Sequence, residues 1–228
     1  QKTAYEISTR DWSSDVCSSD LIADLLVERH GFFKESFANS VKDACSLIFG
    51  WDRAMLEGDT PESRAWREQP DEWWSKKLEK EFSPRLALQL MGTEAGRDVF
   101  HKDIWVHTTM RRCENAPYNN YVIADVRFPN EINAIAKSGG KIIRVRRGDD
   151  PVWWGEALAT NRSKNYDMMK QYYPDVHYSE WAWIGSHYDV ILDNNGTIEQ
   201  LTRMVDEIVN SFYNNHVDAN EVLNYETF

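Results

Sequence analysis

An acidic and a basic residue follow an apolar run in the stretch "ADVRFPNE". The run "YVIADV" over 121–126 predicts a buried strand with Asp125 at its carboxyl end, and Arg127 follows two residues later. A carboxylate is costly to bury there unless it holds a metal ion or a basic partner. An arginine can bind a phosphate through two parallel hydrogen bonds. Two interpretations stay open: a site for Mg²⁺ and phosphate, or a structural ion pair between strand and loop.

Further polar and basic side chains are predicted near the starts of helices, where backbone N–H groups favour anions. "FANSVKDA" places Lys42 and Asp43 in the first turns of one helix. "SPRLALQLMGTE" places Arg85 near the start of another, with Gln89 and Thr93 one turn apart along the same face. The alternatives are a solvated lysine, a surface arginine and a buried amide.

The charged stretch over 51–82 is interrupted by glycine and prolines, which predicts a mobile insert of short helices. Its Arg64 and Arg67 could close over phosphates, although runs of charge also form solvated faces. His177 and Glu180, in "DVHYSEW", fit a polar surface turn better than a catalytic pair.

The elements that must position these residues alternate between helix and strand. Apolar spacing predicts helices over 22–30 and 40–49, and Ser83 with Pro84 forms a typical helix start. "YVIADV", "NEINAIAKSGG" and "KIIRVRR" then read as strand, helix and strand, which is a parallel βαβ unit. We therefore expect a doubly wound α/β fold, in which ligands bind beyond the carboxyl ends of the strands.

A charged, Trp-bearing insert over 148–185 precedes the last predicted strand, in "YDVILDNNG". The following "DNNGT" is expected to make a turn and a helix cap at Thr197, and contact with an adenine ring is a secondary possibility. The last helix ends near residue 213, and 214–228 is a polar tail.

The stretch "DWSSDVCSSDL" over 11–21 has no helical or strand period. Its residues can be back-translated into a sequence that looks like a sequencing-library adapter, which predicts that 1–21 is not natural protein sequence. Such segments are excluded from fold reasoning. A metal cluster of its three Asp and Cys17 is disfavoured, since no His accompanies them and the spacing matches no common metal loop.

Composition limits the class of protein. A chain of 228 residues suits one domain, or one with an inserted subdomain. The net charge of −11 argues against a protein that coats nucleic acid. Cys45 and Cys113 form no C-x-x-C pair, so a reducing cytoplasm is expected. No apolar run is long enough to cross a bilayer, and G-x-x-x-x-G-K-[ST], the usual cradle for ATP phosphates, occurs nowhere.

Several motifs in their order resemble the bacteriophage deoxynucleoside monophosphate kinase family, from about Ile22 to the last helix. They are "FANSVKDA", "EGDTPESRAWREQ", "SPRLALQLMGTEAGRDVFHKDIW", "YVIADVRFPNEINAIAKSGGKIIRVRRG" and "YDVILDNNGTIEQL". The resemblance implies a P-loop NTPase-like αβα fold that transfers the γ-phosphoryl group of ATP, with Mg²⁺, to a deoxynucleoside monophosphate. Family members carry a G-x-x-G-S-G-K-D-[ST] loop just before a helix that begins like "ADLL". Here that loop stands replaced by 11–21, with the first strand missing or replaced.

The resemblance also assigns roles. The expected monophosphate site contains Lys42, Asp43, Arg85, Gln89, Thr93 and Trp105. Arg64 and Arg67 would contact phosphate from a mobile region, and Arg162 would be a lid arginine. Asp125 would lie near Mg²⁺ with Arg127 as its phosphate partner. The kinase domain would span 22–213 in the host cytoplasm, as a monomer or a homodimer.

Two alternatives stay open. One is another P-loop kinase of a small phosphorylated metabolite, such as a dephospho-coenzyme A kinase. The other is a nucleotide-binding module without catalysis, because the chain as written lacks the phosphate-binding loop.

Overall fold

The computed structural model describes the backbone of residues 3–8, 18–118 and 120–222, and the side chains of 18–118 and 120–213. The chain divides into two compact units. The sheet unit is Gln1–Lys34 with Asn119–Phe228, and the helical unit is Glu35–Tyr118.

Five strands form the sheet, in the order β2-β3-β1-β4-β5. They are β1 Thr3–Ser8, β2 Phe33–Glu35, β3 Asn120–Ile123, β4 Lys141–Arg146 and β5 Val190–Asp193. β1 pairs in parallel with β3 and β4, and β4 pairs in parallel with β5. The expected α/β fold with a parallel sheet is confirmed. The place of the first strand, expected to be missing or replaced, is taken by the backbone of "TAYEIS", which pairs on both sides as the central strand.

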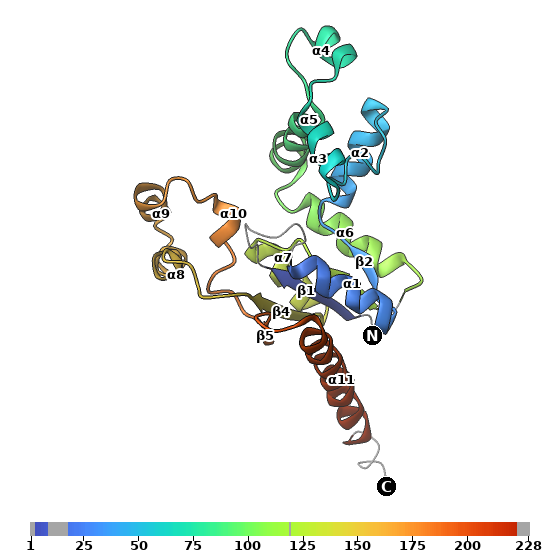
Figure 1. Ribbon diagram of the computed structural model, residues 1–228, viewed down its shortest axis with the longest axis vertical. Coiled ribbons are helices and arrows are strands. Elements are labelled where there is room, and N and C mark those ends of the chain that lie inside the picture. The colour runs from blue at the N-terminus through green and yellow to red at the C-terminus, as the bar shows by residue number, and fades with distance from the viewer. Residues whose placement is uncertain (1–2, 9–17, 119, 223–228) are drawn as a thin grey trace. The chain divides into compact units, whose positions relative to one another are not determined.

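Helices cover both faces of this sheet (Figure 1). α1 Ser18–His30 and α11 Ile198–Val222 share a core with the strands, which includes Ile22, Leu26, Val122, Ile143, Val145, Leu192 and Leu201. Ile142, one residue before Ile143, is buried outside this core, and α7 Pro129–Lys137 packs against β4. The alternation of neighbouring residues between faces is what a strand buried on both sides requires.

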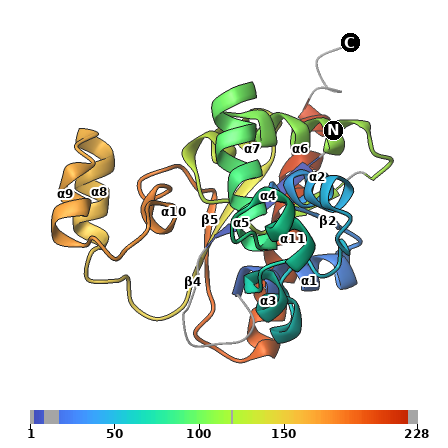
Figure 2. The ribbon, with the colours of Figure 1, turned by 90° about the horizontal axis from the view of Figure 1, so that it is seen from above.

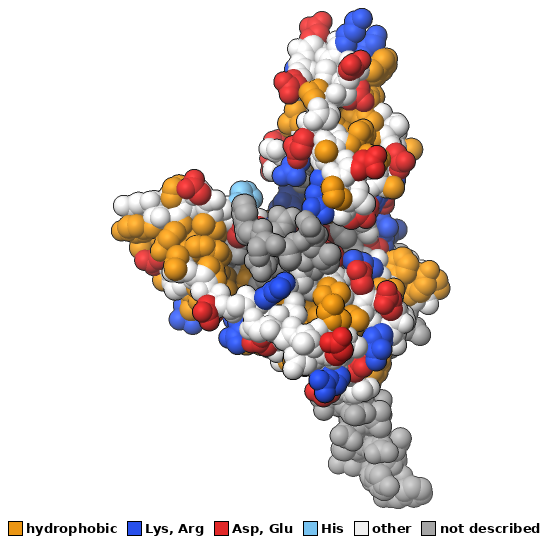
Figure 3. Space-filling model, in the orientation of Figure 1, with side chains coloured by type: hydrophobic (Ala, Val, Ile, Leu, Met, Phe, Trp, Pro, Cys, Tyr) orange, Lys and Arg blue, Asp and Glu red, His pale blue; other side chains and the backbone are white. Residues whose placement is uncertain are grey.

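Between β4 and β5 the chain forms three helices, α8 Trp154–Ser163, α9 Asp167–Tyr172 and α10 Tyr178–Trp181. α8 and α9 lie side by side (Figure 2). The buried members of their small core are Ala157, Met169, Trp181 and Ile184. Apolar side chains are also exposed over α8 and α9 (Figure 3). The predicted insert over 148–185 is therefore helical and has a core of its own.

Arg144 connects this insert to the sheet. The guanidinium carbon lies 4.1 Å from the ring centroid of Trp154 and 5.7 Å from that of Trp183. The same side chain forms an ion pair with Asp150. Cation–π contacts of this kind hold the charge where burial would otherwise penalise it, and they explain part of the high tryptophan content.

The helical unit contains α2 Asn39–Phe49, α3 Pro61–Glu68, α4 Glu72–Leu78, α5 Pro84–Leu90, the π-helix η1 Met91–Phe100 and α6 Ile104–Asn115. Its buried core is Val41, Cys45, Trp51, Leu56, Phe82 and Ala87. The stretch 51–82 holds the short helices expected of it, and Trp51, Leu56 and Phe82 from this stretch lie in the core.

Predicted helix boundaries agree with the structure where capping residues mark them. The Ser83 hydroxyl accepts a hydrogen bond from the Leu86 N–H at 3.3 Å, and Pro84 is the first helical residue of α5. The Thr197 hydroxyl accepts from the Gln200 N–H at 3.3 Å before α11. α1 begins earlier than expected, at Ser18, inside the adapter-like stretch. Among the helices of the described ranges, none is long and apolar enough to cross a membrane.

Candidate active site

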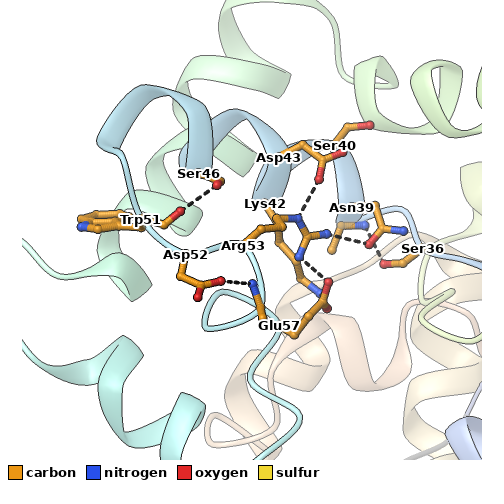
Figure 4. A network of polar contacts seen from close by, with 12 residues as sticks. Ser36, Asn39, Ser40, Lys42, Asp43, Ser46, Trp51, Asp52, Arg53 and Glu57 are labelled. Atoms are coloured by element: carbon orange, nitrogen blue, oxygen red, sulfur yellow. Dashed lines mark hydrogen bonds and ion pairs between the residues drawn. The ribbon is translucent and has the colours of Figure 1, made fainter.

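Lys42 and Asp43 belong to a network of alternating charges in the helical unit (Figure 4). The Lys42 ammonium lies 2.5 Å from a Glu57 carboxylate oxygen. Arg53 donates from Nε to Asp43 at 2.6 Å and also pairs with Glu57. Arg112 donates to the other Asp43 oxygen at 2.8 Å. Lys42 is therefore paired with a carboxylate, and its predicted role toward phosphate requires an exchange of partners.

The inner end of this network is buried. Glu35 is 3% exposed and lies 3.2 Å from Arg112 Nε. Its carboxylate also accepts from the Asn39 amide at 2.5 Å and from the Ser36 N–H at 3.0 Å. A buried carboxylate is tolerated when it has such partners. The contacts hold the end of β2 against the start of α2, where Lys42 and Asp43 lie.

The pKa values of the acids reflect these contacts. Burial by itself would raise the pKa of Glu57, but hydrogen bonds and charge from Lys42 and Arg53 lower it below the ordinary value. Burial would likewise raise the pKa of Asp43, but hydrogen bonds and charge from Arg53 and Arg112 lower it below the ordinary value. Both carboxylates are therefore held in their charged form.

Arg64 and Arg67 bind the backbone of the loop that carries Glu57. Arg64 donates to the carbonyls of Gly58 at 3.1 Å and Asp59 at 2.9 Å. Arg67 donates to the Glu57 carbonyl at 3.2 Å. Gly58 has φ 71°, and a β-carbon there would lie 2.0 Å from Arg67 Cζ. A side chain at this position would force the Arg67 guanidinium to move and would strain the left-handed backbone.

Three of the predicted arginines gather in the helical unit. The pKa of Arg67 is lowered first by burial and then by the positive charge of Arg85, with a smaller effect from Arg64. Arg85 is exposed and lies 3.6 Å from Glu68. Positive charges that act on one another are destabilising unless anions offset them, and Glu68 and Glu57 offset part of the effect on Arg67. We name Arg64, Arg67 and Arg85 the arginine cluster.

Gln89, Thr93 and Trp105 lie along the helices that follow Arg85. Gln89 and Thr93 are exposed, on α5 and η1. The Trp105 indole N–H donates to the Gly92 carbonyl at 2.8 Å, and a β-carbon on Gly96 would lie 2.4 Å from its ring. Trp105 therefore fixes η1 against α6, which is a packing role in addition to the predicted place in the site.

In the sheet unit, Asp125 and Arg127 follow β3 at the expected edge of the sheet. β3 ends at Ile123, so the half-buried Asp125 lies two residues beyond the strand instead of at its last position. Arg127 pairs with Glu180 at 3.1 Å and contacts the Ser179 hydroxyl at 3.3 Å. The structure thus contains an ion pair of Arg127 with a residue of α10, which sequence reasoning had not proposed.

Further hydrogen bonds fix the backbone on either side of this ion pair. The N–H groups of Arg127 and Phe128 both donate to Glu131, at 2.8 and 3.0 Å. Glu131 is 3% exposed and caps the start of α7. His177 accepts at Nδ1 from the Ser179 N–H at 3.3 Å and so caps α10. That capping role agrees with the interpretation of this segment as a polar turn.

Arg162 and the loop after β5 complete the predicted set. Arg162 is exposed in the last turn of α8. After β5, Asp193 accepts from Arg146 at 2.8 Å and from the Asn195 N–H at 3.1 Å. A hollow of about 350 Å³ opens beside this turn and is lined by Asp193, Gly196, Gln200, Arg203, Met204 and Glu207.

Arg53, Glu57, Arg112 and Glu35 were not identified from the sequence. One signal was available, because Arg53 and Glu57 are four residues apart in "WDRAMLE", a spacing typical of helical ion pairs. The pairing of Arg112 with Asp43 spans 69 residues and has no local signal.

Comparison with known proteins decides the family. A protein of Acanthamoeba polyphaga mimivirus, described as a deoxynucleotide monophosphate kinase, is 30% identical over 190 residues, covering 78% of this chain and 83% of that protein. The chain belongs to the deoxynucleoside monophosphate kinase family.

Two further comparisons accompany this family assignment. The deoxynucleoside-5'-monophosphate kinase of Escherichia phage T5 is 47% identical over 49 residues, which is 22% of this chain and 20% of that protein. A dephospho-CoA kinase from Campylobacter jejuni aligns with 92% of this chain and 97% of its own, at 12% identity and a TM-score of 0.37. No family model matches the sequence.

The residues of this kinase family member fit Mg²⁺ better than they fit the phosphates of ATP. Asp125 offers an oxygen ligand of the kind Mg²⁺ prefers, beyond the carboxyl end of β3. The connection between β1 and α1, residues 9–17, lies outside the described residues. Its sequence "TRDWSSDVC" contains neither the glycines nor the lysine of a triphosphate cradle. The chain as written therefore does not fit the phosphates of ATP at this position.

Proposed function

We propose that the natural form of this chain transfers a phosphoryl group from ATP to a deoxynucleoside monophosphate and so forms the diphosphate. The observation that carries this proposal, beside the family, is the arginine cluster. The pKa of Arg67 is lowered by burial and then by the positive charges of Arg85 and Arg64, and a dianionic phosphate bound among the three guanidinium groups would relieve this repulsion. A monophosphate ester carries that charge.

The charge network around Glu57 would hold the arginine cluster in position. Glu57 pairs with Lys42 and Arg53, while the backbone next to it accepts hydrogen bonds from Arg64 and Arg67. The loop that holds the arginines is thereby tied to α2. Catalysis of phosphoryl transfer depends on such positioning and on charge stabilisation.

In the sheet unit, Asp125 would hold Mg²⁺, which when bound neutralises charge on the transferring phosphate. Arg127 would contact a phosphate oxygen in place of Glu180. The hollow beside Asp193 and Gly196 has room for a planar base and is our candidate for the adenine contact. Arg162 on α8 is a candidate lid arginine that would reach the phosphates when α8 closes.

We further propose that residues 1–21 replace the natural N-terminal segment and that the 228-residue chain as written transfers no phosphate. Residues 22–213 form the kinase domain, with 51–82 and 148–185 as its inserts. The protein acts in the host cytoplasm on free nucleotides, as a monomer or homodimer.

The test compares two proteins. One is the chain as written; the other, the loop-restored variant, has 11–21 replaced by a loop of the form G-x-x-G-S-G-K-D-S. ADP release is measured with each of the four deoxynucleoside monophosphates and with dephospho-coenzyme A. We expect turnover only for the loop-restored variant and only with deoxynucleotides.

A matched control carries alanine in place of the lysine of the restored loop and should be inactive. Activity confined to dephospho-coenzyme A would overturn the substrate assignment. Turnover by the chain as written would refute the replacement of the loop.

A further inference from the structure

Two histidines and an aspartate lie together at the junction of η1 and α6, apart from the residues assigned above. His101, Asp103 and His107 each bring one potential ligand atom to within 4.8 Å of the others. The ring centroids of His101 and His107 are 5.5 Å apart. Both histidines are exposed and Asp103 is half-buried, so an ion could enter from solvent.

The local backbone explains why the three side chains meet. η1 ends at Phe100, and His101 is extended, which breaks the helix and turns the chain into α6. The His107 N–H bonds to the Asp103 carbonyl at 2.9 Å, the first-turn spacing that puts their side chains on one face of α6. The Asp103 N–H donates to Nδ1 of His101 at 3.1 Å and holds that ring against the helix start.

Asp103 is unusual for its position. An aspartate before the first helical residue normally accepts a hydrogen bond from an N–H of the first turn. Asp103 makes no such side-chain capping bond. Its carboxylate lies with the two imidazoles instead, although capping would stabilise α6 by about 1 kcal/mol.

The donor set selects a class of ion. Two imidazole nitrogens and one carboxylate oxygen suit Zn²⁺ and similar divalent transition metals, whereas Mg²⁺ prefers oxygen ligands only. Bonds of about 2.1 Å in tetrahedral geometry separate ligand atoms by about 3.4 Å. Side-chain rotation of the exposed histidines can close the remaining gap. A fourth position stays open to water.

We propose that His101, Asp103 and His107 bind one divalent transition-metal ion of the zinc class, which clamps the end of η1 to the first turns of α6. Trp105 lies between Asp103 and His107 in the sequence, and its indole N–H already donates to the Gly92 carbonyl in η1. The ion therefore stabilises the η1–α6 junction in the helical unit. This proposal does not depend on the kinase reaction.

Cobalt provides the test, because Co²⁺ bound by nitrogen and oxygen ligands in tetrahedral geometry absorbs visible light. The full 228-residue chain, freed of metal, is titrated with Co²⁺ and then with Zn²⁺. We expect one saturating equivalent of Co²⁺, a visible band and displacement by Zn²⁺. Saturating Zn²⁺ should also raise the Tm, since an ion that binds only the folded state stabilises it.

Variants assign the site. His107→Ala and His101→Ala should each weaken Co²⁺ binding at least tenfold, and Asp103→Asn should weaken it less. The matched control is His187→Ala, because His187 is also an exposed histidine, 3.9 Å from Asp189. Circular dichroism verifies that each variant is folded.

Two results would overturn the proposal: no stoichiometric binding by the unmodified chain, or equal binding by the His101→Ala with His107→Ala double variant. Loss of binding in His187→Ala alone would move the site to the sheet unit and refute it as well. Should either alanine variant fail to fold, His101→Gln and His107→Gln replace it, because they keep the size of the side chain.

Discussion

The guanidinium of Arg67 occupies the space that a side chain on Gly58 would need. A β-carbon there would lie 2.0 Å from Arg67 Cζ, and Gly58 also has a left-handed backbone with φ 71°. Gly58 is therefore constrained twice, by its left-handed backbone and by the Arg67 guanidinium beside it. Arg67 is one of the predicted phosphate-binding residues.

Gly58→Ala should destabilise the protein more than backbone strain alone can explain. The left-handed conformation costs about 1–2 kcal/mol for a residue with a β-carbon, and displacement of Arg67 adds to it. Gly50→Ala is the matched control, since Gly50 has φ 72° with nothing within 4 Å of an added β-carbon. Urea unfolding measures both, and equal losses would show that Arg67 simply moves aside.

Removal of one member of the arginine cluster should weaken binding of the monophosphate. In the loop-restored variant, Arg67→Ala should raise the KM for deoxynucleotide about tenfold to hundredfold, because a hydrogen bond to a charged group contributes about 1.5–3 kcal/mol. Arg111→Ala, an exposed arginine on α6, is the control. An unchanged KM in Arg67→Ala, with the protein folded, would remove the cluster from the site.

Glu57 should make the protein sensitive to acid. Its pKa is lowered on folding from an ordinary value of 4.5, so the stabilisation is present above that pH and is lost as the pH falls through the lower, folded-state value. Glu57→Gln should lower stability at pH 7 and flatten the decline below pH 4.5. Urea unfolding at a series of pH values tests this, with the exposed Glu62→Gln as control. An identical pH slope in Glu57→Gln would contradict it.

The ion pair of Arg127 and Glu180 should couple β3 to α10. Both side chains are partly buried, 32% and 23% exposed, so the coupling should exceed that of a surface pair and reach about 1 kcal/mol. A double-mutant cycle with Arg127→Ala and Glu180→Ala, followed by thermal or urea unfolding, measures it. Additive effects of the two changes would show that the pair contributes nothing.

Binding of phosphate by Arg127 would have to compete with that pair. In the loop-restored variant, Glu180→Gln should therefore lower the KM for one of the two nucleotides while Arg127→Ala lowers kcat/KM. Steady-state kinetics separates these effects. A Glu180→Gln enzyme with unchanged KM for both nucleotides would indicate that Arg127 keeps its structural partner during the reaction.

Local features of the sequence determined much of the architecture. Ser83 with Pro84, and Thr197, marked helix starts, because capping involves residues that are close in the sequence. The apolar runs of β3, β4 and β5 indicated buried parallel strands, because a continuous apolar run is also a property of neighbouring residues. The ordered motifs also carried the family assignment, which the mimivirus relative confirms.

The tertiary structure alone decided which charges are partners. Arg127 had two candidate roles in the sequence, with Asp125 or with phosphate, and it pairs with Glu180, 53 residues away. Asp43 likewise meets Arg112 across 69 residues. Such pairings depend on how the helices pack, and no periodicity along the chain predicts them. The cluster of His101, Asp103 and His107 depends on the sequence and on the tertiary structure together. Their spacing is visible in the sequence, but the extended residue that ends η1 brings the three side chains together.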